Sequence, residues 1–293
     1  MKILVTGGAG FIGSHITDLY IKAGHKVAVI DNLSYGNEKN VNPKARFYKA
    51  DIKNLAAIDK IFKKNHFDIV NHHAALVEVA KSMIDPNPTF ETNTNGTINL
   101  LTLGGKYGIK KFIFASTGGA IYGESKKIPT DESVEPNPLS PYGLSKYLSE
   151  LAIKFYSNVY GFDYFIFRYP NVYGPRQTPK GEAGVVPIFF GLMKKGKRPT
   201  IFGDGSKTRD YAYVSDIARA NLLALKKGKK ETVNLGKAII QFIWDEKFRS
   251  AEELEQFNRF KNRVFVCRND GGAYGGVGGV LLALHKIGTH LRR

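Results

Sequence analysis

Hydrophobic residues occur in two alternating patterns along the first 170 positions, as short continuous runs and as stripes of helical spacing. Residues 2–6 are typical of a buried strand, and residues 12–23 carry an apolar stripe that is typical of a helix. Strands that alternate with helices form parallel sheets covered by helices on both faces. We therefore predict a doubly wound α/β fold. Further strands are expected at 26–30, 45–49, 67–71, 111–115 and 163–168, and further helices at 55–64, 91–107 and around residues 142–146.

The pattern changes near Asn171. Loops rich in glycine and proline (174–187), a helix near 184–195 and a turn at 203–206 suggest a smaller second lobe. The run 210–226 is typical of a strand followed by a helix that returns to the main sheet. We expect residues 1–170, with 208–236 returning to them, to form one domain, and residues 171–207 and 237–293 to form a C-terminal substrate lobe.

Composition narrows the class of protein. The 293 residues contain one cysteine, Cys267, so no intramolecular disulfide is available, which fits a reducing cytoplasm. No apolar run approaches the ~20 residues that span a membrane, no signal peptide precedes the first strand, and no metal-ligand spacing occurs. The net charge of +17 is spread over short lysine groups without a nucleic-acid-binding module. We expect solvated basic faces and an anionic small-molecule ligand rather than nucleic acid.

Three glycines follow the first strand and open the first helix. Gly7, Gly10 and Gly13 allow a tight turn and a close approach of the backbone to a pyrophosphate, which the helix N-terminus attracts. Asp31 ends the next strand, where a carboxylate accepts hydrogen bonds from adenosine ribose hydroxyls and repels a 2′-phosphate. This context favours an NAD site over a solvated turn aspartate.

Two other strand ends hold polar or small residues. Asp51 and Ile52 follow the third strand and could border the adenine, although Asp51 could equally cap the next helix. His72 and His73 end the fourth strand; neighbouring side chains point to opposite faces, so we do not expect metal binding there. The small residues that follow, Ala74 and Ala75, would let a cofactor approach the backbone closely.

Tyr142 and Lys146 are four positions apart and therefore share one face of a helix. A neighbouring cation favours the phenolate that a tyrosine needs to act as a base near neutral pH. Such a pair arises by chance in many proteins, but together with a dinucleotide site it indicates redox chemistry. Ser116 and Thr117 end another strand, where a hydroxyl could bind the substrate oxygen whose proton Tyr142 removes, although such residues are usually turn formers.

In this order the motifs resemble the extended short-chain dehydrogenases/reductases that act on nucleotide sugars, the NAD-dependent epimerase/dehydratase family, and within it most the UDP-glucose 4-epimerases. The resemblance covers about residues 1–236. It is carried by Gly7-x-x-Gly10-x-x-Gly13, Asp31-Asn32-Leu33-Ser34, His73-Ala74-Ala75, Ser116-Thr117, Tyr142 with Lys146, and the run Arg-Tyr-Pro-Asn-Val-Tyr-Gly-Pro-Arg-Gln at 168–177.

The resemblance implies a role for each matching position. Tyr142 would be the base, Lys146 would hold the nicotinamide ribose and lower the pKa of the tyrosine, and Thr117, ahead of Ser116, would bridge to the sugar hydroxyl. NAD contacts would extend to Phe11, Ile12, Asn32, Ser34, Gly36 and Pro170. The UDP-sugar would contact Asn171, Val185, Thr200 and Phe202, with Arg209 on its pyrophosphate. The resemblance further implies a homodimer through the helices near 92–107 and 142–159.

The resemblance also separates reaction types. Sugar 4,6-dehydratases carry an Asp-Glu pair just after the catalytic threonine, whereas residues 118–120 are Gly-Gly-Ala here, and the single cysteine lies far from this site in the sequence. These features favour 4-epimerisation over dehydration or 3,5-epimerisation. The substrate could be a neutral, N-acetylated or uronic UDP-sugar, and an NAD-binding protein without turnover stays an alternative.

Residues 237–293 depart from the family pattern after Val-Asn-Leu-Gly at 233–236. All 12 prolines lie at or before Pro199, whereas the only tryptophan and the only cysteine follow residue 240. Two explanations stay open, a frame-shifted or replaced C-terminal segment and genuine divergence. A family-like peptide in another reading frame of the coding DNA would distinguish them.

Overall fold

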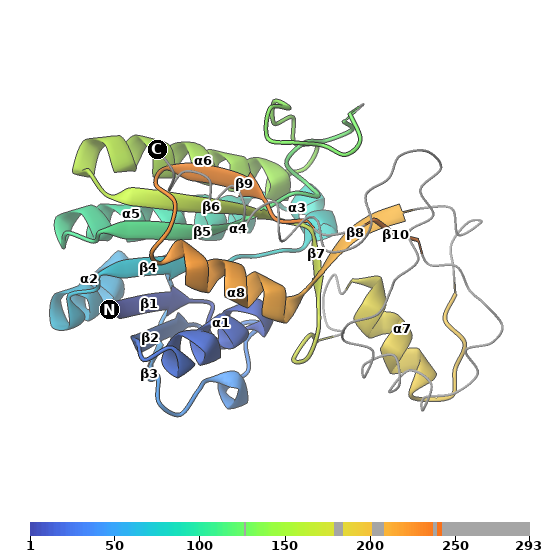
Figure 1. Ribbon diagram of the computed structural model, residues 1–293, viewed down its shortest axis with the longest axis horizontal. Coiled ribbons are helices and arrows are strands. Elements are labelled where there is room, and N and C mark those ends of the chain that lie inside the picture. The colour runs from blue at the N-terminus through green and yellow to red at the C-terminus, as the bar shows by residue number, and fades with distance from the viewer. Residues whose placement is uncertain (126, 179–183, 201–207, 237–238, 242–293) are drawn as a thin grey trace.

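The computed structural model describes residues 1–125, 127–178, 184–200, 208–236 and 239–241. Its main domain is a seven-stranded sheet in which every pairing is parallel, in the order β3-β2-β1-β4-β5-β6-β9 (Figure 1). The prediction of a doubly wound sheet is confirmed. The strands are β1 (Lys2–Thr6), β2 (Lys26–Asp31), β3 (Arg46–Lys49), β4 (Ile69–His72), β5 (Lys111–Thr117), β6 (Asp163–Tyr169) and β9 (Glu231–Asn234).

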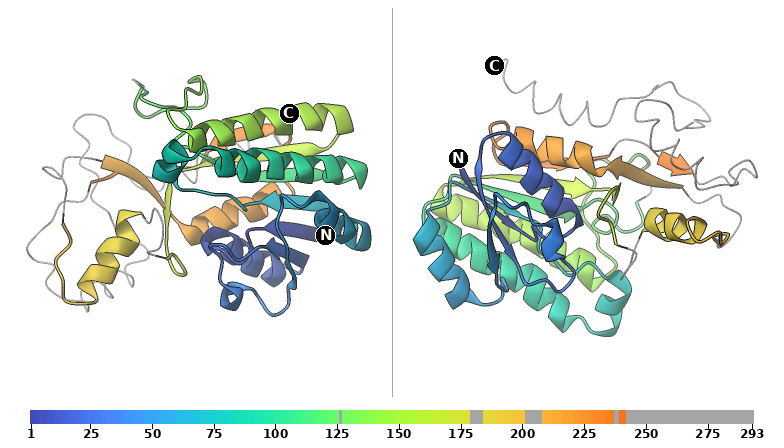
Figure 2. Two further views of the ribbon diagram at one scale, coloured as in Figure 1. Left: turned by 180° about the vertical axis from the view of Figure 1, so that it is seen from behind. Right: turned by 90° about the horizontal axis from the view of Figure 1, so that it is seen from below.

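Helices cover both faces of this sheet (Figure 2). One face packs on α1 (Phe11–Lys22) and α8 (Val214–Ala224) through a core that includes Ile16, Tyr20 and Ile217. The other face packs on α2 (Leu55–Asn65), α5 (Gly96–Lys106) and α6 (Pro141–Tyr160), with Phe62, Leu100 and Ile153 in its core. The shorter elements are η1 (Glu38–Asn40), α3 (Val79–Ile84), α4 (Asn87–Thr89) and the π-helical turn η2 (Phe90–Asn95), which replaces the start of the helix expected at 91–107.

The strand order reverses at β1, which lies between β2 and β4. Ligands of open α/β sheets bind at the carboxyl ends of the strands at such a switch point. In this sheet the reversal places the ends of β1, β2 and β4 beside one another, so the turns that follow them form one rim. Every NAD-binding segment expected before residue 80 follows one of these strands or β3.

A second, three-stranded sheet lies beyond the carboxyl ends of the main strands, beside α7 (Val185–Met193) (Figure 1). In it β8 (Thr208–Tyr213) pairs in parallel with β7 (Asn171–Tyr173) and antiparallel with β10 (Ile239–Gln241). The strand and helix expected within 210–226 are present as β8 and α8. However, only the helix packs on the main sheet, because β8 pairs with β7 instead. The turn expected at 203–206 and residues 242–293 lie outside the described residues.

Candidate active site

The turn after β1 has no room for side chains at two of its glycines. Gly7 has φ +69°, and a Cβ there would lie 2.7 Å from the backbone nitrogen of Ala74. A Cβ on Gly13 would lie 2.3 Å from the carbonyl oxygen of Gly7. The turn therefore packs directly on the chain that leaves β4, and α1 begins at Phe11 with Gly10 as its N-cap. This cradle, open at a helix N-terminus, fits the pyrophosphate of a dinucleotide.

Asp31 stands at the end of β2 and faces this turn. Its carboxylate is 8% exposed and accepts hydrogen bonds from the backbone N–H of Ala9 (3.0 Å) and of Leu33 (2.8 Å). Burial raises the pKa of Asp31, and the two N–H groups oppose that change. A carboxylate offers about four lone pairs, so two stay available for ribose hydroxyls. Gly36 lets its loop pass this carboxylate, since a Cβ there would lie 2.8 Å from Asp31 Oδ1.

The residues after β2 and β3 are joined to each other. Asn32 Nδ2 donates to Asp51 Oδ2 (3.1 Å), and the backbone N–H of Ser34 donates to Asn32 Oδ1 (3.0 Å). Asp51 is not the cap of α2, because Asn54 holds that position. The side chain of Ile52 is buried in the core, so only its backbone is placed to border an adenine.

Lys146 is buried on α6 directly above the end of β5. Its Nζ donates to the carbonyl oxygen of Ala115 (2.9 Å) and lies 4.8 Å from the centre of the Phe114 ring. Burial lowers the pKa of Lys146 to about 7, and the charge of Glu150 opposes that change. A lysine with this pKa can change its charge near neutrality in response to a ligand.

Tyr142 lies in the first turn of the same helix, which begins after Ser140, whose hydroxyl accepts the N–H of Gly143 (3.1 Å). The helix touches the segment that follows Thr117, because a Cβ on Gly143 would lie 2.4 Å from the carbonyl oxygen of Ala120. The structure thus brings the helix of Tyr142 and Lys146 against the strand end of Thr117. Gly143 was missed in the sequence; its signal was a glycine in the first turn of a helix.

The two hydroxyls at the end of β5 differ in their partners. Ser116 Oγ donates to Glu150 Oε1 (2.5 Å) and is 4% exposed. Thr117 Oγ1 accepts the backbone N–H of Ala120 (3.2 Å), which leaves its own proton for another acceptor. This favours Thr117 over Ser116 as the substrate contact.

The two histidines at the end of β4, His72 and His73, also differ in their hydrogen-bond partners. His72 bonds Thr6 Oγ1 (2.6 Å) and Thr97 Oγ1 (2.9 Å), so both ring nitrogens are satisfied in the core. The ring of His73 bonds the hydroxyl of Tyr169 (3.1 Å), and its buried Nδ1 has no hydrogen-bond partner among the residues that the structure describes. Burial lowers the pKa of His73 to about 3. The backbone of His73, together with that of Ala74, lies against the turn at Gly7, so the unpaired ring nitrogen is consistent with a polar ligand near this turn.

The expected substrate residues belong to the smaller lobe or its boundary. Asn171 and Arg209 are exposed on β7 and β8, with Asn171 Nδ2 donating to the carbonyl oxygen of Asp210 (3.1 Å). Val185 begins α7, and Thr200 is exposed beyond its end. Pro170 joins β6 to β7, so it links the two sheets. Phe202 lies outside the described residues.

A buried charged network behind the site was not assigned from the sequence. Arg168 and Glu150 form a two-pronged ion pair, and Arg168 Nη1 donates to the hydroxyl of Tyr122 (2.7 Å). That hydroxyl donates to Asn234 Oδ1 (2.7 Å) on β9, and Asn234 Nδ2 donates to the carbonyl oxygen of Thr130 (3.1 Å). The only signal in the sequence was an arginine at the end of an otherwise apolar strand.

Two absences concern the described part of the chain alone. No group of three or more His, Cys, Asp or Glu side chains there is arranged to hold a metal ion. None of the described helices is both long and apolar enough to cross a membrane.

A doubly wound sheet with this glycine turn and a helix that carries a Tyr/Lys pair is the framework of a dinucleotide-dependent short-chain dehydrogenase/reductase. The chain belongs to the NAD dependent epimerase/dehydratase family, whose profile matches residues 3–236. The predictions of the family and of NAD as its cofactor are thereby confirmed. The match ends at the residue where the motifs of the family were no longer found.

Curated and solved relatives agree with this membership. A putative UDP-glucose 4-epimerase of Methanocaldococcus jannaschii is 53% identical over 234 residues, 80% of this chain and 76% of that protein. The crystal structure of a UDP-glucose 4-epimerase from Thermotoga maritima with UDP-glucose has a TM-score of 0.80 and 50% identity, covering 82% of this chain and 79% of that one. A Thermus thermophilus UDP-glucose 4-epimerase in complex with NAD has a TM-score of 0.78 and 42% identity, with 82% and 79% covered.

Proposed function

We propose that this protein catalyses the NAD-dependent epimerisation of a UDP-sugar at C4, of the UDP-glucose/UDP-galactose type, through a 4-keto intermediate. The observation that carries the proposal is the contact between α6, with Tyr142 and Lys146, and the end of β5, with Thr117, beside the glycine turn. No acidic side chain stands at residues 118–120, which removes the groups that a dehydratase would use. The relatives described above support the same reaction.

Each of the three proposed catalytic residues has a separate role in the reaction. Tyr142 takes the proton of the 4-hydroxyl group and later returns it, because a phenolate is a base of suitable strength. Lys146 favours that phenolate by its charge and binds the nicotinamide ribose. Thr117 holds the sugar oxygen within reach of the tyrosine. NAD, when bound between the glycine turn and Lys146, supplies the acceptor and donor of the hydride.

The residues proposed to bind the UDP-sugar belong to the smaller lobe or its boundary. Arg209 would bind the pyrophosphate, because a guanidinium carries fixed donors for phosphate oxygens. Asn171, Val185, Thr200 and Phe202 would surround the nucleotide and the sugar.

The test is conversion of UDP-galactose to UDP-glucose by the purified protein with NAD. UDP-N-acetylglucosamine and UDP-glucuronate assayed beside it identify the sugar class. Turnover of only one of these two substrates would support the proposed 4-epimerase activity and would change the substrate assigned to it. NADH absorbance without product would indicate a stalled half-reaction, and no turnover of any of the three would contradict the proposal and leave an NAD-binding protein.

We also propose that two copies associate through α6. This helix exposes an apolar stripe, since its hydrophobic side chains recur at spacings of four, three, four and four residues. A contiguous apolar stripe of this kind is typical of a protein–protein interface. Light scattering should give the mass of a dimer, and a monomer at assay concentration would contradict the proposal. The stripe consists of Leu144, Leu148, Leu151, Phe155 and Val159.

The location in the cytoplasm remains a prediction from the single cysteine. Cell fractionation with an antibody to the protein tests it.

A further inference from the structure

A carboxylate is fully buried one helical turn beyond Lys146. Glu150 is 0% exposed, and its two oxygens accept three hydrogen bonds. Arg168 Nε donates to Oε1 (3.1 Å), Arg168 Nη2 donates to Oε2 (2.7 Å), and Ser116 Oγ donates to Oε1 (2.5 Å). A buried charge with this many charge-assisted partners has one orientation only.

The three residues come from the three elements that meet at the site. Glu150 lies on α6 four residues after Lys146, Ser116 precedes Thr117 on β5, and Arg168 lies near the end of β6. The carboxylate therefore ties the helix of the proposed base to the strand of the proposed hydroxyl donor. A displacement of about 1 Å between such groups can cost about 10²-fold in rate.

The same carboxylate acts on the charge of Lys146. The titratable groups that interact with this lysine are His72 at the end of β4, His73 just after it, and Glu150 on the same helix. Arg168 of β6 is paired with Glu150, and β5 contributes the carbonyl oxygen of Ala115. Both histidines are neutral because burial and the nearby lysine lower their pKa. Glu150 is thus the negative charge in this set that favours the protonated lysine, while burial disfavours it.

We propose that Glu150 is a positioning residue: it fixes the turn of α6 that carries Lys146 against the strand of Thr117 and favours the protonated form of Lys146. The role rests on the proposed function, because a protonated Lys146 matters through the phenolate of Tyr142. A buried ion pair could also contribute to stability alone, and breaking one by removing a partner destabilises a protein in either case. The charge of Lys146 is the property that separates the two roles.

The decisive variant is Glu150→Gln, which keeps the size of the side chain and removes its charge. Without that charge Lys146 loses its proton more readily, so the fall of kcat on the alkaline side should move to lower pH by about one unit. The matched control is Glu91→Gln on η2, which removes an exposed carboxylate paired with Lys53 and should leave the profile unchanged. An unmoved profile in a folded Glu150→Gln protein would overturn the proposal, even if its Tm falls.

Glu150→Asp provides the second variant should Glu150→Gln not fold. Aspartate keeps the negative charge on a side chain that is one methylene shorter, which places the charge further from Lys146. The alkaline limb of the kcat profile should therefore move in the same direction by a smaller amount. An alkaline limb that does not move overturns the proposal.

A readout without turnover separates this proposal from the proposed function. The ammonium of Lys146, assigned in 15N NMR spectra by comparison with Lys146→Met, is titrated in the NAD-free protein. A lower titration midpoint in Glu150→Gln supports the role in charge even if no UDP-sugar is epimerised. An unchanged midpoint overturns it even if the enzyme is active.

Discussion

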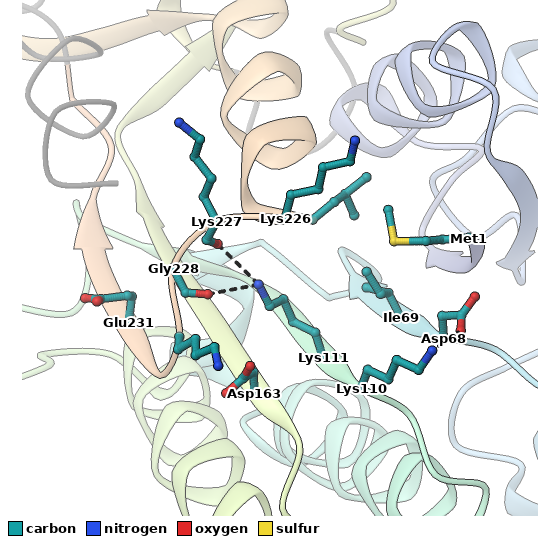
Figure 3. A pocket seen from close by; sticks show the side chains of 12 residues that line it. Met1, Asp68, Ile69, Lys110, Lys111, Asp163, Lys226, Lys227, Gly228 and Glu231 are labelled. Carbon is teal, nitrogen blue, oxygen red and sulfur yellow. Dashed lines mark hydrogen bonds and ion pairs between the residues drawn. The ribbon is translucent and has the colours of Figure 1, made fainter. Parts of the chain in front are cut away.

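The two ends of the main sheet each bury a lysine, and the two lysines differ in what binds them. At the amino end Lys111 is 7% exposed, and its Nζ donates to the carbonyl oxygens of Ala224 (2.9 Å), Lys227 (3.2 Å) and Gly228 (2.9 Å). Figure 3 shows the bonds to Lys227 and Gly228. At the carboxyl end Lys146 donates one hydrogen bond among the described residues, to Ala115. An ammonium has three donors. The carbonyl oxygens at the end of α8 therefore accept all three N–H donors of Lys111, whereas Lys146 keeps two N–H groups for a ligand.

The amino end also shows that a cavity is not sufficient for a site. A pocket of about 470 Å³ opens there between the starts of β4, β5 and β6 and the turn after α8. Two of its lysines are bound by the fold: Lys111 by the carbonyl oxygens named above, and Lys110 by Asp68 (3.1 Å). The side chains of Lys226 and Lys227 extend away from Lys111 (Figure 3). The carboxyl end instead combines a helix N-terminus, a glycine cradle and unsaturated polar groups.

The largest effect is expected from Tyr142→Phe. Removal of the proposed base should lower kcat about 10²- to 10⁴-fold while the protein keeps its NAD, because only proton transfer is lost. The matched control is Tyr147→Phe on the same helix, which should retain full activity. Retention of most activity in Tyr142→Phe would show that the chemistry lies elsewhere.

Lys146→Met should lose activity and gain stability. Burial lowers the pKa of Lys146 from 10.5 to about 7, so the unfolded chain binds one more proton between these pH values. Stability of the wild type therefore rises with pH over this window, and the cost of the buried charge is largest at and below pH 7. Thermal unfolding should show the variant more stable at pH 7, with a difference that shrinks toward pH 10. A variant less stable than the wild type at pH 7 would contradict the assignment.

Gly7→Ala should release NAD. The left-handed backbone costs about 1–2 kcal/mol for alanine, and the Cβ would also clash with Ala74. Gly108 offers a matched control toward the amino end of β5, because it has the same φ of +69° but nothing within 4 Å of a Cβ. Gly108→Ala should introduce the backbone strain without a steric clash, so this variant should retain NAD. The NAD content of both variants is measured after gel filtration. Equal loss of NAD in both would contradict a role in NAD binding for the turn after β1.

The smallest kinetic effect is expected from Lys111→Met. Three carbonyl oxygens would lose their donor, which should lower the free energy of unfolding by about 1–3 kcal/mol. Neither kcat nor KM should change, because the lysine lies at the opposite end of the sheet from the site. A changed KM for the UDP-sugar would show that the two ends are coupled.

Much of this arrangement was predictable from the sequence because it depends on local order. The glycine turn, Asp31 and the Tyr142–Lys146 pair each follow from spacing along one strand or helix. The pairing of Glu150 with Arg168 was not, because they are 18 residues apart on different elements and only tertiary packing brings them together. The position of β8 in the second sheet was missed for the same reason, since hydrophobic periodicity identifies a strand but not its partner.

The hydrogen bond from Tyr122 to Asn234 spans 112 residues. Such distant partners meet only after the entropy of closing a long loop has been overcome, so they belong to the slow part of folding. During synthesis the ribosome must therefore deliver β9 before Tyr122 acquires this partner, although Tyr142 and Lys146 have long since emerged. The network behind the site is therefore completed late, by a strand that carries none of the proposed catalytic groups.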